Sequence, residues 1–284
     1  MANHHFGKFG DVWKHMVLDE VLAHVSPARY AETHAGSAAY PMIRDAERDY
    51  GVLQFLDRAS FSDTLAASAF HDVASRFVTG EPALYPGSAL QAMTLLGDDC
   101  AYLLCDTDPV SVVDLGRYAG RLELSRCDVL HGDGMSAVHE RLSDRLTTVV
   151  HIDPFDPFAR EAGGLSALEL AAEVSDAGHS LVYWYGYDSP HERSWALDVI
   201  GSRTGTSLWC GDLMVDSPAG FSDRNGDLGI ATTPGTGCGV VLAHATTPVV
   251  DRCEELAHAL VEIYEGAALP SGLPGRLDLT VVTT

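Results

Sequence analysis

The chain has 284 residues, of which 46% are hydrophobic and 8% aromatic, so it can bury a sizeable core and disorder is not expected. Forty acidic residues against 18 basic ones give a formal net charge of −22, and only Lys8 and Lys14 are lysines. Such a surface repels phosphate backbones and disfavours a nucleic-acid partner, although adaptation to salt or a preference for arginine codons would give the same balance.

The sequence lacks the signals of a membrane or secreted protein. No apolar run reaches the length of a membrane span, and the N-terminal residues lack the apolar stretch of a signal peptide, so we expect a cytoplasmic protein with no membrane partner. The six cysteines have no Cys-x-x-Cys spacing and are expected to be reduced. His4, His5, His15 and His24 do not have a metal-ligand spacing, so no metal site is predicted.

The apolar periodicity alternates between helical and extended segments. A helix is expected over 11–25, with Asp11 as its N-cap, and a short strand over 29–36. Residues 40–78 have a helical pattern that breaks near Ala59 to Phe61. Beyond it, strands are expected at 100–108, 126–133, 147–153, 180–187, 206–215, 237–244 and 277–283, and helices at 112–120, 135–144, 165–178 and 249–264.

Strands that alternate with helices through short turns predict a mostly parallel sheet with helices on both faces. The stretch from 43 to 84 is the exception, because it has the length of about two helices and no strand pattern. We therefore expect one α/β domain over 1–284 that carries 43–84 as a small helical insertion subdomain. In such a sheet, ligands bind at the carboxyl ends of the strands, near the point where the strand order reverses.

Four successive strands end in groups that can contact a ligand. "ETHAGSAAY" (32–40) brings small residues after the first strand, and "CDTDP" (105–109) brings Asp106 and Asp108 after the second. "HGDG" (131–134) and "HIDPF" (151–155) bring Asp133 and Asp153. Each acid by itself also fits a turn or N-cap residue. The four together, in this order, are typical of an S-adenosylmethionine site.

These motifs, together with "FGDVWKH" (9–15) and "YPGSALQAMTLL" (85–96), occur in the order found in the RlmJ-type family. That family consists of methyltransferases that act on an adenine N6 of large-subunit ribosomal RNA, and this chain resembles it over most of its length. The resemblance implies a class I, Rossmann-like methyltransferase fold with a seven-stranded sheet. It also implies S-adenosyl-L-methionine as the cofactor and S-adenosyl-L-homocysteine as its product.

The resemblance further implies which residues bind the cofactor. Lys14, His15, His34 and Ser88 are expected around its methionine end, Gly36 in the turn beside it, Asp106 at the ribose, Asp133 at the adenine and Asp153 at the methyl group. Asp106 replaces the Glu that the family usually has. Glu32 stands where the family has Asp.

The acceptor motif departs further from the family. In the family's Asp-Pro-Pro-Tyr motif, the Asp and the next carbonyl hold the exocyclic amine, and the Tyr stacks on the base. Asp153, Pro154, Phe155 and Asp156 occupy these positions here, so the stacking Tyr is absent. We assign these four as candidate catalytic residues, with Phe155 and Phe158 as a replacement wall. Asp156 fits a turn-forming residue equally well.

The next strand end is aromatic. "YWYGYDSPHERSW" (183–195) brings Tyr183, Trp184, Tyr185 and Tyr187, of which at most half can line a pocket because alternate residues face the core.

Three functions remain open from the sequence. The acidic surface and the altered motif favour a methyltransferase whose acceptor is a small molecule, methylated on nitrogen. The resemblance by itself favours a ribosomal RNA adenine-N6 methyltransferase. A protein that binds S-adenosylmethionine as a sensor, or for chemistry other than methyl transfer, is the third.

Overall fold

The computed structural model describes residues 6–142, 146–156, 160, 164–187, 190–216, 237–269 and 274–284. Its main sheet has eight strands in the order β10-β8-β9-β7-β6-β1-β4-β5. The strands are β1 (Arg29–Glu32), β4 (Ala101–Asp106), β5 (Cys127–His131), β6 (Thr148–Ile152), β7 (Ser180–Tyr187), β8 (Leu208–Asp216), β9 (Gly237–Ala243) and β10 (Arg276–Thr283).

The five strands from β5 to β7 are parallel to one another. β9 runs antiparallel to both β7 and β8, and β10 runs antiparallel to β8. The predicted Rossmann-like α/β fold with a mostly parallel sheet is confirmed. The sheet has the eight strands that the sequence patterns predicted, one more than the seven that the resemblance implied; β10, a run rich in β-branched residues, pairs with β8 at the edge.

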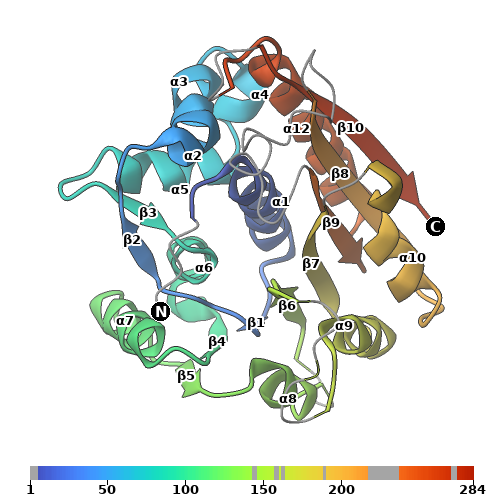
Figure 1. Cartoon of the computed structure of the whole chain (residues 1–284). Coiled ribbons are helices and arrows are strands. Elements are labelled where there is room, and N and C mark those ends of the chain that lie inside the picture. The colour runs from blue at the N-terminus through green and yellow to red at the C-terminus, as the bar shows by residue number, and fades with distance from the viewer. Residues whose placement is uncertain are drawn as a thin grey trace.

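Helices cover both faces of this sheet (Figure 1). One buried cluster packs α1 (Phe9–Val25), α6 (Ser88–Leu96), α7 (Pro109–Arg121) and α12 (Thr247–Tyr264) against one face. The other cluster packs α8 (Gly134–His139), α9 (Ala167–Asp176) and α10 (Trp195–Gly201) against the opposite face. The sequence patterns did not predict α6 or α10, which are short and lie among loops and motif residues.

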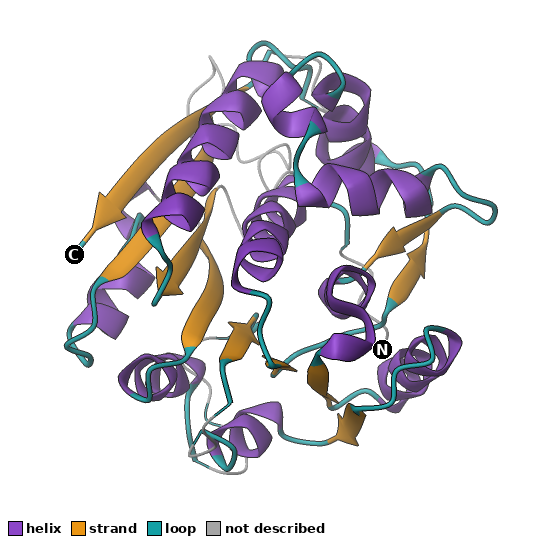
Figure 2. Ribbon diagram, turned by 180° about the vertical axis from the view of Figure 1, so that it is seen from behind, coloured by secondary structure: helices purple, strands orange, loops and turns teal. Residues whose placement is uncertain are grey.

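The segment between β1 and β4 contains short helices and a separate pair of strands. The helices are α2 (Ala46–Arg48), a π-helical turn (Asp49–Leu53), α3 (Gln54–Ala59), α4 (Asp63–Ala66) and α5 (Ala69–Val78). The predicted break is confirmed, because α3 ends at Ala59 and α4 begins at Asp63. β2 (Ala39–Pro41) and β3 (Leu84–Pro86) form an antiparallel pair that was not predicted, since strands of three residues show no alternation (Figure 2). The division into a domain and an insertion remains a prediction.

The start of α1 differs from the sequence prediction. The helix begins at Phe9, so Asp11 lies within its first turn and is not the N-cap. Asp11 instead accepts a hydrogen bond from the backbone N–H of Lys8 at 3.3 Å. A carboxylate in the first turn also interacts favourably with the helix dipole. The side chain of Asp11 thereby stays near the end of the helix that faces the strand ends.

Contacts with distant parts of the chain fix the position of α1. The indole N–H of Trp13 donates to the Gly211 carbonyl at 3.1 Å, across 198 positions of sequence. Gly51 lies so close to the Gly7 carbonyl that a Cβ at Gly51 would fall inside the 3.0 Å limit of real contacts. The Tyr264 hydroxyl donates to the Gly51 carbonyl at 2.8 Å. The N-terminal half of α1 and the residues before it are therefore held from β8, from the π-helical turn that contains Gly51 and, through that turn, from α12.

All six cysteines are free, and five of them are buried, as expected for reduced thiols. Among the residues that the structure describes, no helix has the length and apolar character needed to cross a membrane.

Candidate active site

The candidate site lies where the strand order reverses. The chain passes from β1 outward to β4 and β5, then returns to the other side of β1 to form β6 and β7. The carboxyl ends of β1 and β6 therefore flank the point at which α/β sheets bind ligands. The start of α1 reaches the same edge, because its Lys14 contacts the residue that follows β6.

Asp106, at the end of β4, holds the turn that follows β1. Its two carboxylate oxygens accept hydrogen bonds from the backbone N–H groups of Gly36, at 2.8 Å, and Asp108, at 2.7 Å. Gly36 has a φ of +58° and leaves no room for a Cβ beside the Tyr40 hydroxyl, so glycine is required there. A carboxylate offers about four acceptor positions, so Asp106 keeps some for a further donor.

Asp133, after β5, is the N-cap of α8. One of its oxygens accepts from the backbone N–H groups of Met135 and Ser136, at 3.0 and 3.3 Å, and the other accepts from the Ser136 hydroxyl at 2.5 Å. The following Gly134 packs against the carbonyl of Thr33, so α8 starts in contact with the end of β1. Asp133 thus has the capping role that its sequence position also allowed, and it lies at the same sheet edge as Asp106.

Asp153, directly after β6, forms an ion pair with Lys14. The ammonium lies 2.6 Å from a carboxylate oxygen of Asp153 and 3.0 Å from one of Asp11, and it lies over the Trp184 ring at 5.4 Å from the centroid. The Lys14 side chain is 8% exposed and that of Asp153 is 22% exposed. Asp11 and Trp184 had no role assigned in this pair from the sequence. The i, i+3 spacing of Asp11 and Lys14 on one helix was the available signal.

Both members of this pair are charged at neutral pH. Burial favours the neutral acid, yet Lys14, together with His151 and His34, holds the pKa of Asp153 below its ordinary value. Burial likewise favours the neutral amine, yet Asp153 and Asp11 hold the pKa of Lys14 above its ordinary value. The site therefore presents an ionised, partly exposed carboxylate at the end of β6.

Glu32, at the end of β1, is the centre of a buried polar cluster. It accepts hydrogen bonds from the Ser88 hydroxyl, at 2.5 Å, and the Tyr30 hydroxyl, at 2.9 Å. His151 Nδ1 lies 2.8 Å from the same carboxylate, and neither of these two side chains is exposed. The proton of Ser88 is thus committed to Glu32. Polar residues inside the strand segments "RYAE" and "TVVHI" were the signal for this cluster.

His15 and His34 lie in different surroundings. The His15 ring is buried between α1, β3 and α6, where Nδ1 lies 2.8 Å from the Tyr85 hydroxyl and 2.7 Å from the Gln91 amide nitrogen. Burial, and then the charges of Lys14 and His151, hold the pKa of His15 well below its ordinary value, so the ring is neutral. His34 Nδ1 bonds with the Thr33 hydroxyl at 2.7 Å, at the strand edge.

The residues that follow Asp153 turn away from the buried pair. Pro154 is buried, whereas Phe155 is 91% exposed and Asp156 is exposed. Phe158, expected as part of an apolar wall, lies outside the described residues. Phe155 is thus largely in solvent, and the ring that lies over the Lys14 ammonium is that of Trp184.

Asp212, on β8, engages the aromatic end of β7. Its carboxylate accepts from the hydroxyls of Tyr185, at 2.9 Å, and Tyr187, and from the backbone N–H of Ser194 at 3.2 Å. Gly239, between the two strands, leaves room for the Tyr185 ring, because a Cβ there would overlap it. Burial raises the pKa of Asp212 despite these donors. Tyr185 and Tyr187 therefore serve this cluster and do not line the Asp153 site.

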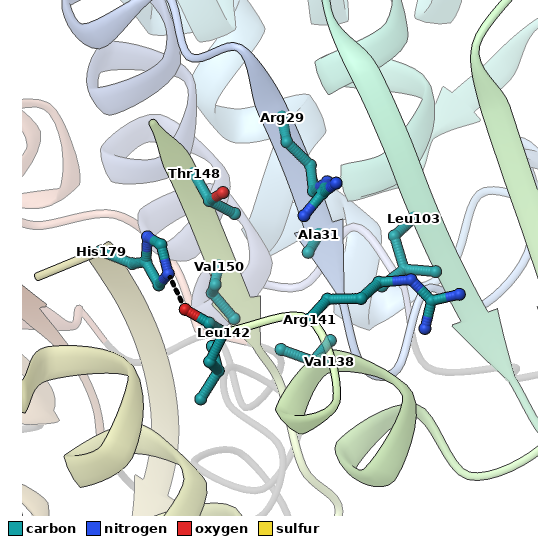
Figure 3. A pocket seen from close by; sticks show the side chains of 9 residues that line it. All are labelled: Arg29, Ala31, Leu103, Val138, Arg141, Leu142, Thr148, Val150 and His179. Carbon is teal, nitrogen blue, oxygen red and sulfur yellow. Dashed lines mark hydrogen bonds between the residues drawn. The ribbon is translucent and has the colours of Figure 1, made fainter. Parts of the chain in front are cut away.

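A small pocket at the opposite edge of the sheet is unrelated to this site (Figure 3). It lies among the starts of β1 and β6, at Arg29 and Thr148, and the end of α8. His179 Nε2 bonds with the Leu142 carbonyl at 2.9 Å, and Arg141 donates to a helix carbonyl at 2.8 Å. Arg141 thus satisfies a carbonyl in the last turn of α8, and His179 pairs with a carbonyl of the turn that follows the helix.

The donors and acceptors at the strand ends fit the cofactor that the family resemblance implies. Asp106 and Asp133 offer acceptors for a ribose diol and an adenine amino group, and Lys14 offers a cation for a carboxylate. Across the described ranges, no three His, Cys, Asp or Glu side chains gather in a way that would hold a metal ion.

Comparison with solved structures supports the fold. Protein LPL1258 of Legionella pneumophila, described as a DUF519 protein, is 19% identical and superposes with a TM-score of 0.73, covering 98% of each chain. The precorrin 8w decarboxylase of Methanobacterium thermoautotrophicum is 13% identical, covers 56% of this chain and 77% of its own, and has a TM-score of 0.34. A SAM-dependent methyltransferase of Agrobacterium tumefaciens is 14% identical, covers 54% of this chain and 52% of its own, and also has a TM-score of 0.34.

No protein-family model matches this sequence, and no curated protein does. At 19% identity the Legionella pneumophila structure shows a shared fold over the whole chain, and the two weaker superpositions carry no argument.

Proposed function

We propose that the protein is an S-adenosylmethionine-dependent methyltransferase that methylates an amino nitrogen of a small molecule. The observation that carries this proposal is the ionised Asp153 at the end of β6, held by Lys14 at the point where the strand order reverses. A carboxylate in that place accepts a hydrogen bond from an amine and so orients the nitrogen lone pair. When bound, the cofactor supplies an electrophilic methyl group whose transfer needs no acid.

The chain's own residues bind and orient the two reactants. Asp106 and Asp133 are assigned to the ribose and the adenine, and Lys14 to the carboxylate of the methionine part. Asp153 holds the acceptor nitrogen in its neutral form, because a protonated amine has no lone pair to attack the methyl group. The nitrogen becomes cationic as the methyl group is transferred, and the Trp184 ring beside it suits that charge, because aromatic faces attract cations. The extra proton of the product then leaves to solvent.

Two features favour a small acceptor over ribosomal RNA. The family resemblance extends to RNA adenine-N6 methyltransferases, but the motif at 153–156 lacks the Tyr that stacks on a base, and Phe155 is 91% exposed. Lys8 and Lys14 are both buried, so neither lysine of this chain is available for phosphates, and the net charge is −22.

Calorimetric titration with S-adenosylhomocysteine tests the cofactor. We expect saturable binding that Asp106→Asn weakens by roughly tenfold, the effect of losing one charge-assisted hydrogen bond. Asp108→Asn is the matched control, because Asp108 caps α7 through the Val110 N–H and should leave the affinity within about twofold. A flat titration of the wild type would refute the proposal.

Transfer is then measured with methyl-labelled cofactor, on a panel of primary and secondary amines and on undermethylated ribosomal RNA. We expect label on an amine, and loss of labelling in Asp153→Asn, which still binds S-adenosylhomocysteine. Labelling of RNA with a steep salt dependence would instead establish the RNA activity. Binding without transfer to either class would leave a sensor or another sulfonium chemistry as the function.

A further inference from the structure

Lys14 occupies the position that an acceptor amine needs. Its ammonium contacts the carboxylates of Asp153 and Asp11 at 2.6 and 3.0 Å and faces the Trp184 ring at 5.4 Å. Two anionic acceptors and an aromatic face are the surroundings that a protonated amine seeks in a protein. The Lys14 side chain thus makes the contacts that the proposed acceptor amine would make as it enters the site.

Lys14 and an acceptor amine therefore compete for Asp153. The Asp153 side chain is only 22% exposed, and Lys14, which is 8% exposed, covers the oxygen that faces α1. An acceptor amine that arrives protonated would also be repelled by the Lys14 ammonium, and it gives its proton to solvent before it accepts the methyl group. An amine gains full access to Asp153 only when the ammonium of Lys14 has an anion besides Asp11 to contact, because losing one of its two anionic partners leaves a buried charge only partly compensated.

We infer that Lys14 sets the order in which the site fills, an inference that rests on the proposed function. Its ammonium stays on Asp153 and Asp11 until the carboxylate of the cofactor's methionine part offers an anion that replaces Asp153, and only then does Asp153 become open to the acceptor amine. Lys14 is thus a positioning residue that links the two binding sites. By thermodynamic linkage, each reactant then strengthens the binding of the other by the same factor.

The composition of the chain makes the movement of Lys14 directly measurable. Lys8 and Lys14 are its two lysines, so ¹³C,¹⁵N-lysine labelling gives two sets of side-chain NMR signals, which Lys8→Arg assigns. Lys8 pairs with Glu47 at 3.0 Å and serves as an internal reference. We expect S-adenosylhomocysteine to shift the Lys14 signal and to leave the Lys8 signal in place.

Two ligands that differ in their carboxylate test whether that group causes the movement of Lys14. 5′-Methylthioadenosine has the adenine, ribose and sulfur of S-adenosylhomocysteine but no carboxylate, so it should bind without shifting the Lys14 signal. Lys14→Met should weaken S-adenosylhomocysteine by roughly tenfold or more and change 5′-methylthioadenosine by less than about twofold. Unchanged binding of 5′-methylthioadenosine also shows that the variant is folded.

Asp153→Asn gives the result that separates competition from a structural role. Removing the charge that holds Lys14 should strengthen the binding of S-adenosylhomocysteine on the order of threefold or more. Lys14 would then be paired with residue 153 in a smaller fraction of the protein and would be available to the carboxylate of the ligand in a larger fraction. A site that merely needs Asp153 for its shape would bind more weakly. Asp108→Asn, which also removes a carboxylate near the strand ends but leaves the ion pair intact, is the control and should give no gain in affinity.

The outcomes distinguish this inference from the function on which it rests. If S-adenosylhomocysteine binds while the Lys14 signal stays in place and Asp153→Asn shows no gain, the ordering role is overturned and the cofactor assignment stands. If neither ligand binds the wild-type protein, the proposed function fails and the ordering role fails with it. A shift of Lys14 with both ligands would also overturn the role, since the carboxylate would not be its cause.

Discussion

Asp19→Asn should stabilise the protein at neutral pH. Asp19 lies in α1 with its side chain fully buried, and neither of its carboxylate oxygens has a hydrogen-bond partner in the described part of the chain. Burial, reinforced by the charge of Glu20, raises the pKa of Asp19 well above its ordinary value. The folded protein therefore keeps this proton over a pH range in which the unfolded chain has lost it.

The sign and size of the effect follow from linkage. Because the folded state binds more protons than the unfolded state, the free energy of unfolding falls as the pH rises above about 4, the ordinary pKa of an Asp carboxyl. For a single proton the slope is about 1 to 1.5 kcal/mol per pH unit, and it ends at the raised pKa of Asp19. Asparagine has the same shape and does not titrate, so Asp19→Asn should match the wild type near pH 4 and gain stability from there upward.

Urea unfolding followed by tryptophan fluorescence at pH 4, 5, 6 and 7 gives the difference in free energy directly. The lowered pKa of His15 has the opposite effect on stability, because the free energy of unfolding decreases as the pH falls below about 6.5. This contribution is the same in the wild type and in Asp19→Asn, so it cancels in the difference between them. Asp57→Asn, at an exposed position on α3, is the control for the substitution itself. A difference that does not change with pH, or that grows toward low pH, would refute the reasoning.

Two further substitutions test other parts of the structure. Gly239→Ala places a methyl group where it overlaps the Tyr185 ring and should lower the free energy of unfolding by about 1–3 kcal/mol in the same urea assay. Gly116→Ala, in α7, has open space around it and should raise the free energy of unfolding by up to about 1 kcal/mol. Equal effects at the two glycines would contradict the packing at Asp212. Phe155→Ala should change stability by less than about 0.5 kcal/mol, because the ring is 91% exposed, and should lower kcat/KM for the methylated amine. Unaltered kinetics would exclude Phe155 from the acceptor site.

The sequence predicted the elements whose signals are local. Apolar runs located every strand of the main sheet, and the small-residue turn and acids that follow four of those strands located the edge where Asp106, Asp133 and Asp153 lie. The position of the helix break after Ala59 was also visible in the pattern. These features depend on neighbours within a few positions of sequence.

The contacts that determine the chemistry were not visible in the same way. Lys14 and Asp153 are 139 positions apart, and Glu32 and His151 are 119 apart, so their pairing depends on the packing of α1 and β6 against β1. The sequence showed polar residues in apolar segments but not which of them meet. It also could not show that Asp133 caps α8 while Asp106 holds the turn of Gly36, since both roles fit the same short motifs.

The anchoring of α1 has a consequence for how the protein is made. The N-terminal half of this helix is held by Gly211, which bonds with Trp13 across 198 positions, and by the Gly51 turn, which Tyr264 contacts across 213 positions. During synthesis on the ribosome, Lys14 therefore emerges long before the segments that fix its helix. Asp153 also emerges before Gly211 and Tyr264, so the ion pair at the strand ends cannot reach its final support on a partly made chain. The site is completed late in translation, and a nascent chain that stops before β8 would carry its residues without their geometry.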